Sequence, residues 1–207
     1  MRRQIIEARK RVDKILLTDA ALVGVIAAFL FAIQVGLPLS IQTQFVFNHD
    51  TFALPTLLTS AYVHHDTTHL LKNLSGFLVA TSVVYWLCWQ LGERRWFRIT
   101  TILFLVMLPV LVNLSSYVIF EGLVPDATPS DRGFSGVGAG FVGFLFAAFF
   151  VWLNKRSSWN VAVYLSEGVA VIIVWVLALI YRGFGYWVLG LVVLGISLSG
   201  LGIYNQI

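Results

Sequence analysis

Residues 133–140 read Gly-Phe-Ser-Gly-Val-Gly-Ala-Gly, and they open an apolar run that continues to Leu153. As a helix, this run is long enough to cross about 30 Å of membrane hydrocarbon. A serine between glycines, at the point where a loop enters a helix, is a geometry that exposes a hydroxyl for nucleophilic attack. Ser135 is therefore the first candidate functional residue, and its role depends on what the rest of the chain brings to it.

The composition of the whole chain indicates a membrane protein. Hydrophobic residues make up 58% of the 207 residues, charged residues make up 12%, and the mean hydropathy is +0.85. This balance is far more apolar than that of a soluble domain. The single cysteine, Cys88, lies in an apolar run and cannot form an intrachain disulfide. We expect it to be a small buried side chain, and the sequence predicts no cofactor.

Six apolar segments predict an all-α, polytopic transmembrane bundle. The basic N-terminal residues 1–19 lack the pattern of a secretory signal, and we interpret them as a cytoplasmic arm that precedes the membrane domain of residues 20–207. An interfacial helix and a solvated arm both remain open for it. Thr18 and Asp19 are the predicted N-cap of the first span. The six predicted spans are 20–37, 68–91, 99–120, 135–153, 161–181 and 184–204.

Two segments of this bundle are irregular. Residues 38–66 contain only a short apolar stretch, 53–58, and we expect them to lie at the outer interface. The third span contains Pro109 and Asn113. A bundle tolerates a proline at this depth when neighbouring groups satisfy the backbone carbonyl that the proline leaves without a donor.

The distribution of basic residues predicts the orientation of the spans. With the N-terminus in the cytoplasm, 11 of the 14 lysines and arginines fall on the cytoplasmic side. Six of these are in the arm, Arg94, Arg95 and Arg98 follow the second span, and Lys155 and Arg156 follow the fourth. The positive-inside rule therefore places both termini in the cytoplasm. Topology explains the basic pI, so the predicted surroundings are a lipid bilayer and not nucleic acid.

A second polar motif falls at the same membrane depth as Ser135. Residues 64–73 read His-His-Asp-Thr-Thr-His-Leu-Leu-Lys-Asn and open the second span from the outer face. His69 and Asn73 are four residues apart, so they share one side of a helix. Polar side chains within a span usually face the bundle interior and mark function. We expect this pair to converge on Ser135. His49, His64 and His65 lie at or near the outer surface, where we expect simple interfacial or loop-packing roles for them.

Together these residues resemble the rhomboid intramembrane serine proteases. The resemblance covers residues 60–204, and it includes six spans with both ends in the cytoplasm. It implies cleavage of transmembrane-anchored proteins near the outer membrane face. The motifs that carry it are His69-x-x-x-Asn73 with His64 five residues earlier, and Gly133-x-Ser135-Gly136-x-x-x-Gly140.

The resemblance implies a role for each motif residue. Ser135 would be the nucleophile, and His69, Asn73 and the Ser135 backbone N–H would donate hydrogen bonds to the developing oxyanion. Gly136 and Gly140 form a small-xxx-small face for helix packing. In the family the helix packed there is the sixth, which also supplies a histidine as general base.

That histidine is absent from this sequence, which has none after His69. The nearest match to its setting is Trp187-x-x-Gly190, and a serine hydroxyl without a base is a weak nucleophile. Three explanations are open. The reading frame continues past Ile207 into a segment that carries the histidine, or the protein is a pseudoprotease that binds transmembrane helices without cutting them, or Lys72 serves as the base.

A rival interpretation starts from the same histidines. His65-Asp66-x-x-His69 resembles the His-Glu-x-x-His zinc motif of intramembrane metalloproteases. Aspartate replaces the glutamate, and the chain offers no matching third ligand in a later span. The sequence therefore predicts no metal site.

Overall fold

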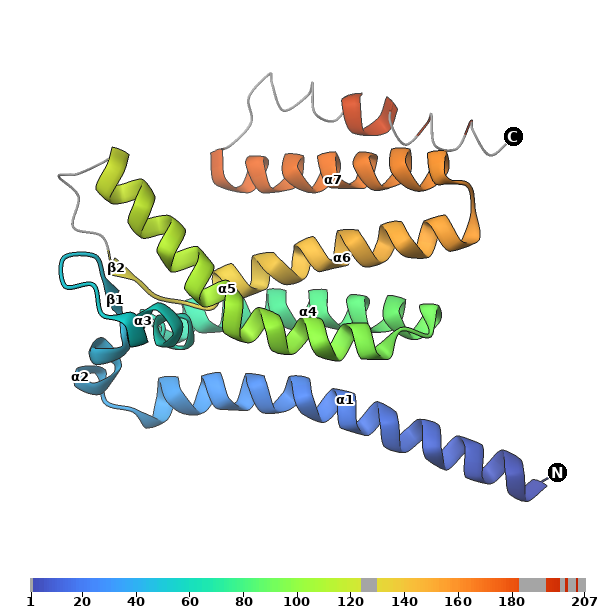
Figure 1. Cartoon of the computed structure of the whole chain (residues 1–207), viewed down its shortest axis with the longest axis horizontal. Helices are drawn as coiled ribbons and strands as arrows, with labels where there is room; N and C mark the ends of the chain where they lie inside the picture. Colours follow the sequence, from blue (N-terminus) through green and yellow to red (C-terminus); the bar gives the residue numbers. More distant parts are fainter. Residues whose placement is uncertain (1, 124–129, 183–192, 198–199, 201–203, 205–207) are drawn as a thin grey trace. The chain divides into compact units, whose positions relative to one another are not determined.

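The computed structural model describes residues 2–123, 130–182, 193–197, 200 and 204 (Figure 1). The chain divides into two compact units, residues 1–82 with 95–141 and residues 83–94 with 142–207, so α4 and α6 each contribute to both. The predicted sixth span, 184–204, lies mostly outside the described residues, and so do Trp187 and Gly190.

Helices account for most of the described chain, as predicted. The elements are α1 (Arg2–Gly36), α2 (Leu39–Gln42), η1 (Thr43–Phe45), β1 (Phe47–Asn48), α3 (Leu54–Thr59), η2 (Ser60–Tyr62), α4 (Thr67–Leu91), α5 (Arg94–Leu123), β2 (Ser130–Asp131), α6 (Ser135–Arg156) and α7 (Trp159–Arg182).

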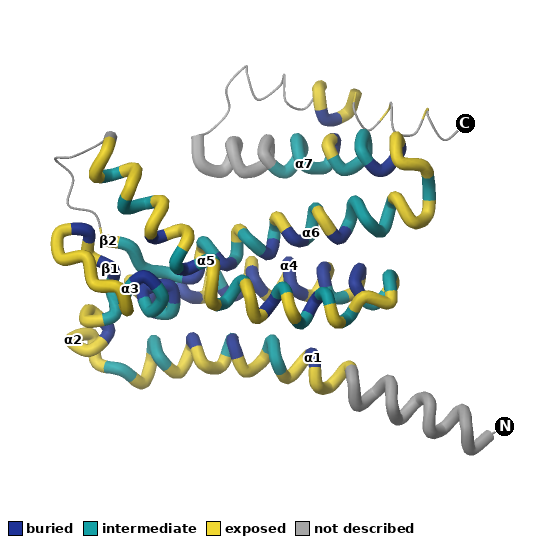
Figure 2. The backbone as a smooth tube through the Cα atoms, viewed as in Figure 1, coloured by how far each residue is buried: buried dark blue, intermediate teal, exposed yellow. Residues whose placement is uncertain are grey.

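Four of these helices are long and apolar enough to cross a membrane, which indicates a membrane protein. They are Leu16–Gly36, Thr67–Leu91, Arg94–Gly122 and Ser135–Arg156. Large apolar side chains on them are exposed, for example Val25 and Val118. Figure 2 shows exposed positions along α1, α4, α5 and α6. Lipid is the surrounding that makes such exposure favourable, because in water it would leave contiguous apolar surface uncovered.

The start of the first span differs from the prediction. Thr18 and Asp19 do not cap a helix, because α1 continues through them from Arg2. Asp19 is instead 2% exposed and accepts a hydrogen bond from Nε of Arg98 on α5. A carboxylate buried at this depth requires a cationic partner, and Arg98 supplies it. The predicted cap is therefore an interhelical ion pair.

Helix α5 passes through Pro109 without ending. Proline has no N–H, so the carbonyl of Leu105, four residues earlier, loses its helical donor. The hydroxyl of Tyr62 in η2 donates to that carbonyl instead. The expectation that a neighbour would satisfy the freed backbone group is confirmed, and the bond joins η2 to the middle of α5.

Buried aromatic rings form the core of the first unit around the start of α6. Phe77 on α4 lies edge-on to Phe134 and Phe141, with ring centroids 5.2 and 5.1 Å apart. Phe104 on α5 packs against Phe141 at 5.5 Å. Edge-to-face pairs of this kind add stability beyond the burial of their area. They fix the α6 N-terminus, and so Ser135, against α4 and α5.

The second unit contains the ends of α4 and α6 and the helix α7. Trp86 and Trp152 pack at 6.0 Å between ring centroids, and Phe150 lies edge-on to Trp159 at 5.1 Å. Helix α7 matches the predicted fifth span, 161–181, in its bounds. Part of it, Trp159–Ile173, is an apolar helix shorter than the four described above.

Candidate functional site

Ser135 is the first residue of α6, and its side chain is exposed. It lies on a pocket of about 120 Å³, together with residues of α5 and of the loop before α6. Asn113, Ser116, Asp131 and Arg132 give this pocket a polar lining. The first N–H groups of a helix have no acceptor within the helix. The sequence prediction that Ser135 presents its hydroxyl at a loop-to-helix turn agrees with this position.

Two backbone hydrogen bonds hold the loop that carries Ser135. The N–H of Gly133 donates to the carbonyl of Ser60 at 3.0 Å, and the N–H of Phe134 donates to Nε2 of His64 at 3.2 Å. Residues 60–64 therefore anchor two successive peptide groups immediately before Ser135.

His64 is a buried acceptor that holds the loop before α6, which agrees with the loop-packing role that we expected for it. It is 1% exposed, and because Nε2 accepts from Phe134, the neutral ring carries its proton on Nδ1. Burial, followed by the positive charge of His69, lowers the pKa of His64 to about 4. His64 thus fixes the loop and has no lone pair left to accept a proton from Ser135.

His69 and Asn73 lie beside the same loop. A Cβ atom built on Gly133 would stand 3.2 Å from Cε1 of His69 and 3.6 Å from Nδ2 of Asn73. The structure therefore brings the two α4 side chains against the backbone two residues before Ser135. Nδ2 of Asn73 is buried and has no hydrogen-bond acceptor among the described residues. The pair thus includes a donor without a described acceptor beside Gly133, two residues before the exposed Ser135.

The first turn of α4 is capped by Asp66. Its Oδ1 accepts from the N–H of His69 at 2.8 Å, and this hydrogen bond lowers the pKa of the Asp66 carboxyl. An aspartate in this position satisfies one of the free N–H groups of the helix and complements its dipole. The cap fixes where α4 begins, and thereby the depth of His69 and Asn73.

The pattern of glycines is explained by close contact with α5. A Cβ on Gly136 would lie 3.0 Å from Cγ2 of Val112, and a Cβ on Gly140 would lie 2.1 Å from Cδ1 of Leu108. The predicted small-residue packing face is present. Its partner among the described residues is α5, whereas the resemblance implied the sixth helix.

Lys72, the base suggested by the sequence, is exposed on α4. It does not line the Ser135 pocket, and neither do His69 and Asn73, which contact the site only at Gly133. The zinc interpretation gains nothing from the geometry either. Within the described ranges, no three histidine, cysteine, aspartate or glutamate side chains are grouped so as to hold a metal ion.

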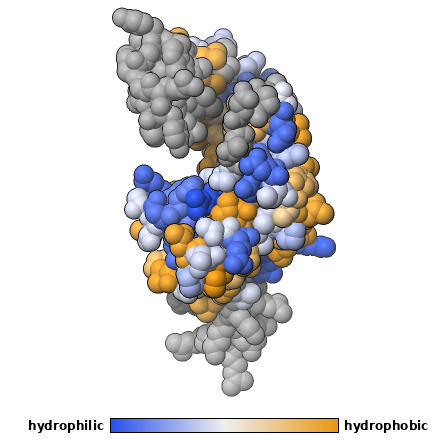
Figure 3. Space-filling view, turned by 90° about the vertical axis from the view of Figure 1, so that its left-hand side faces the viewer, coloured by the Kyte–Doolittle hydropathy of each residue, from blue (hydrophilic) through white to orange (hydrophobic). Residues whose placement is uncertain are grey.

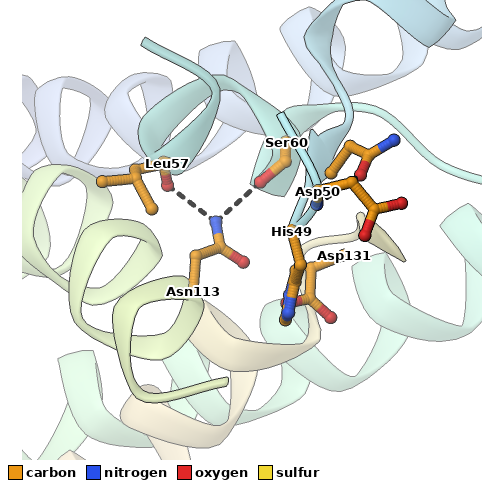
Figure 4. Close-up of polar contacts among 7 residues, drawn as sticks. His49, Asp50, Leu57, Ser60, Asn113 and Asp131 are labelled. Carbon is orange, nitrogen blue, oxygen red and sulfur yellow. Dashed lines mark hydrogen bonds and ion pairs between the residues drawn. The ribbon is translucent and has the colours of Figure 1, made fainter. Parts of the chain in front are cut away.

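The buried His49 pairs with Asp131, which lines the pocket, and no sequence pattern predicts this pair. Nε2 of His49 lies 2.8 Å from Oδ2 of Asp131, and the side chain of His49 is 1% exposed (Figure 4). The ring packs against Phe47, Tyr117 and Phe120. The packing role predicted for His49 is thus accompanied by a hydrogen bond to Asp131. The two residues are 82 positions apart, so no local pattern relates them.

Next to the contact between His49 and Asp131, strand β1 pairs with strand β2. The strands pair antiparallel, with Phe47 opposite Asp131 and Asn48 opposite Ser130. Hydrophilic residues gather at this end of the first unit (Figure 3). The placement of residues 38–66 at the outer membrane interface stays a prediction.

Asn113 links α5 to the anchor of the serine loop. Its Nδ2 donates to the carbonyl of Leu57 and to Oγ of Ser60, both at 2.7 Å (Figure 4). Ser60 in turn accepts from Gly133. A buried amide with both donors satisfied fixes its neighbours more tightly than an apolar side chain does. The sequence identifies Asn113 only as a polar residue within the third predicted span, and it does not predict these hydrogen bonds.

We expect Gly133→Ala to destabilise the protein by about 1–3 kcal/mol. The φ of Gly133 is +117°, which L residues rarely adopt, and the new Cβ would press on His69. Thermal unfolding of the purified protein in detergent measures the change.

The control for this substitution is Gly138→Ala on α6, where an added Cβ meets nothing within 4 Å. Alanine in that helical position should leave stability unchanged or raise it by about 0.5–1 kcal/mol. Equal unfolding temperatures for the two variants would contradict the geometry assigned to Gly133.

No family model, no curated protein and no solved structure matches this chain.

Proposed function

We propose that this chain is a rhomboid-type intramembrane serine protease with six spans and both termini in the cytoplasm. Its Ser135 pocket would receive the backbone of a transmembrane-anchored protein near the outer membrane face and cleave it. The proposal rests on the resemblance of the two motifs and on one observation of geometry, the free amide of Asn73.

That amide is a donor without a protein acceptor. A buried N–H left unpaired costs about 1–3 kcal/mol, so a fold that keeps one offers a place for an acceptor from outside. Nδ2 of Asn73 lies beside Gly133, and the exposed Ser135 follows two residues later. A peptide carbonyl placed there would have a hydroxyl on one side and an N–H donor at its oxygen.

The proposed step forms a bond between Oγ of Ser135 and the carbonyl carbon, and moves the carbonyl electron pair onto oxygen. Asn73, His69 and the Ser135 N–H donate to that oxygen, each worth about 3–4 kcal/mol in comparable sites. The hydroxyl proton passes to a base and from there to the leaving amine nitrogen, and water then hydrolyses the acyl-serine.

The base in this proposal is Asp131. It is the one carboxylate among the described residues that lines the pocket with Ser135. One of its oxygens is bonded to His49, which leaves the other for the proton. A carboxylate is a weaker base than imidazole, so we expect slow turnover.

A second candidate is recognition without cleavage. The sequence from residue 70 to residue 207 contains no histidine, and this favours a protein that binds a transmembrane helix at the same pocket and does not cut it. Asn73 would then hold a backbone carbonyl of an unwound helix, and Ser135 would be a neighbour without a chemical task.

Ser135→Ala and Asn73→Leu distinguish the candidates. The full chain is reconstituted in vesicles with a fluorescent single-span model substrate, and product formation and crosslinking are both measured. A protease loses cleavage in Ser135→Ala and Asp131→Asn, and a serine-directed fluorophosphonate labels Ser135. Ser75→Ala is the matched control, since that exposed hydroxyl bonds only to its own helix.

A binding protein shows no cleavage at all, keeps crosslinking in Ser135→Ala and loses it in Asn73→Leu. If the wild type neither cleaves nor crosslinks the substrate, both candidates are wrong. If cleavage persists in Ser135→Ala, the assignment of the nucleophile is wrong.

A further inference from the structure

The ends of α4 and α6 meet at a cluster of basic and aromatic side chains in the second unit. Nη2 of Arg156 donates to Oε1 of Gln90 at 3.1 Å, and Nζ of Lys155 lies 3.8 Å from Oε1 of Glu93. These contacts bring the C-terminal ends of two spanning helices to one place. We call the residues Trp89, Arg94, Trp152, Lys155 and Arg156 the basic aromatic cluster.

Each arginine of the cluster lies over a tryptophan ring. Cζ of Arg94 is 4.7 Å from the ring centroid of Trp89, and Cζ of Arg156 is 4.6 Å from that of Trp152. When a guanidinium stacks on an aromatic ring, its N–H groups point outward from the edge of the guanidinium plane. In this position they can bind a phosphate oxygen. The stacking therefore orients the donors without neutralising their charge.

The protein does not satisfy all of these donors. Nη1 of Arg94 and Nε1 of Trp152 are buried and have no acceptor within the described chain. The cluster has three cations, Arg94, Lys155 and Arg156, against the single carboxylate of Glu93, which already pairs with Lys155. It therefore has an excess of positive charge and lacks acceptors.

The position of the cluster in the membrane indicates which kind of molecule can supply the missing acceptors. Helices α4 and α6 are long and apolar enough to cross a membrane, and both end here. A cluster at the ends of two such helices is expected at the level of the lipid headgroups, where tryptophan side chains are enriched. Trp86, one turn before Gln90, is 51% exposed and extends the aromatic surface toward the acyl chains. An anionic lipid offers phosphate oxygens, negative charge and an apolar tail together.

We propose that the basic aromatic cluster is a binding site for the headgroup of an anionic phospholipid. Arg94 and Arg156 bind the phosphate, and Lys155 adds charge. The two indoles of the cluster, with that of the neighbouring Trp86, contact the glycerol and upper acyl chains. The site is distinct from Ser135, which begins α6 at the opposite end of a helix of 22 residues, about 33 Å long. The proposal does not depend on the activity of Ser135.

Native mass spectrometry and thermal unfolding of the full chain test this site. The probe is phosphatidylglycerol, with phosphatidylcholine as the neutral comparison. We expect the wild type to retain phosphatidylglycerol and to unfold at a higher temperature with it than with phosphatidylcholine. A cation at a membrane surface contributes about 1 kcal/mol, or fivefold in affinity, so Arg94→Gln with Arg156→Gln should weaken binding on the order of 30-fold.

Arg132→Gln is the matched control, because it removes one cation at the other end of α6 and should leave retention unchanged. A salt titration of the wild type gives a second measurement that needs no variant, since added salt should reduce the phosphatidylglycerol effect. The proposal is wrong if both lipids act alike on the wild type, or if the double variant binds phosphatidylglycerol as the wild type does.

Discussion

Lowering the pH from 6.5 to 4 should reduce the free energy of unfolding by about 3 kcal/mol through His64 alone. Burial holds the pKa of His64 at about 4 in the folded protein, below the ordinary value of 6.5 that it recovers on unfolding. Between these values the unfolded chain binds a proton that the folded chain does not. The group therefore has no effect above pH 6.5, and it destabilises the fold progressively as the pH falls to 4.

Protonation of His64 weakens the attachment of the loop that carries Ser135. A protonated Nε2 is a donor and cannot accept from Phe134, so the loop loses one of its two backbone anchors. Unfolding in detergent at a series of pH values measures the slope. His64→Gln keeps an acceptor oxygen and removes the titration, and it should flatten the curve. His65→Gln, an exposed neighbour, should leave most of the slope in place. If the stability of His64→Gln depends on pH as steeply as that of the wild type, His64 is not the group that causes the dependence.

Arg98→Ala should cost about 3 kcal/mol of stability at neutral pH. Removing one partner of a buried pair costs roughly 3–5 kcal/mol because the other charge stays in the interior. Asp19 is 2% exposed, but the side chain of Arg98 is 42% exposed, so we place the effect at the low end. The expected structural result is weaker attachment of α1 to α5.

The control is Arg95→Ala, an exposed arginine on the same turn of α5, which should change stability by less than about 0.5 kcal/mol. Adding Asp19→Asn to Arg98→Ala removes the unpaired charge and should restore part of the loss. Chemical unfolding of all four proteins gives the comparison. Similar losses of stability for Arg95→Ala and Arg98→Ala would mean that the pair of Asp19 with Arg98 does not stabilise the fold.

The bounds of a helix can be predicted from the sequence where the apolar segment has the same bounds as the helix. The predicted start of the fourth span is the observed start of α6, and the second span differs by one residue from α4 at Thr67. Apolar length and a serine among glycines are local signals, and the bounds of α4 and α6 follow them closely. The third span was predicted as 99–120, whereas α5 begins at Arg94 and ends at Leu123, because charged and polar end residues continue a helix without adding hydropathy.

Long-range pairs were not predictable from the sequence. His69 and Asn73 share a helix face by their spacing, but their approach to Gly133 depends on how α4 packs against the loop. The bond from Tyr62 to Leu105 and the pair of His49 with Asp131 join distant positions whose types are individually unremarkable. Asp19 looked like a helix cap because a cap requires only a local pattern, whereas an ion pair requires the partner to be known.

The pairing of Asp19 with Arg98 also sets an order of events during synthesis. Arg98 lies 79 residues after Asp19, and ribosomes add about 5–20 residues per second, so the arginine follows the aspartate by roughly 4–16 s. Throughout that interval α1 is available for insertion while its carboxylate has no counter-ion. The ion pair between Asp19 and Arg98 can therefore form only after the first helix has already been made.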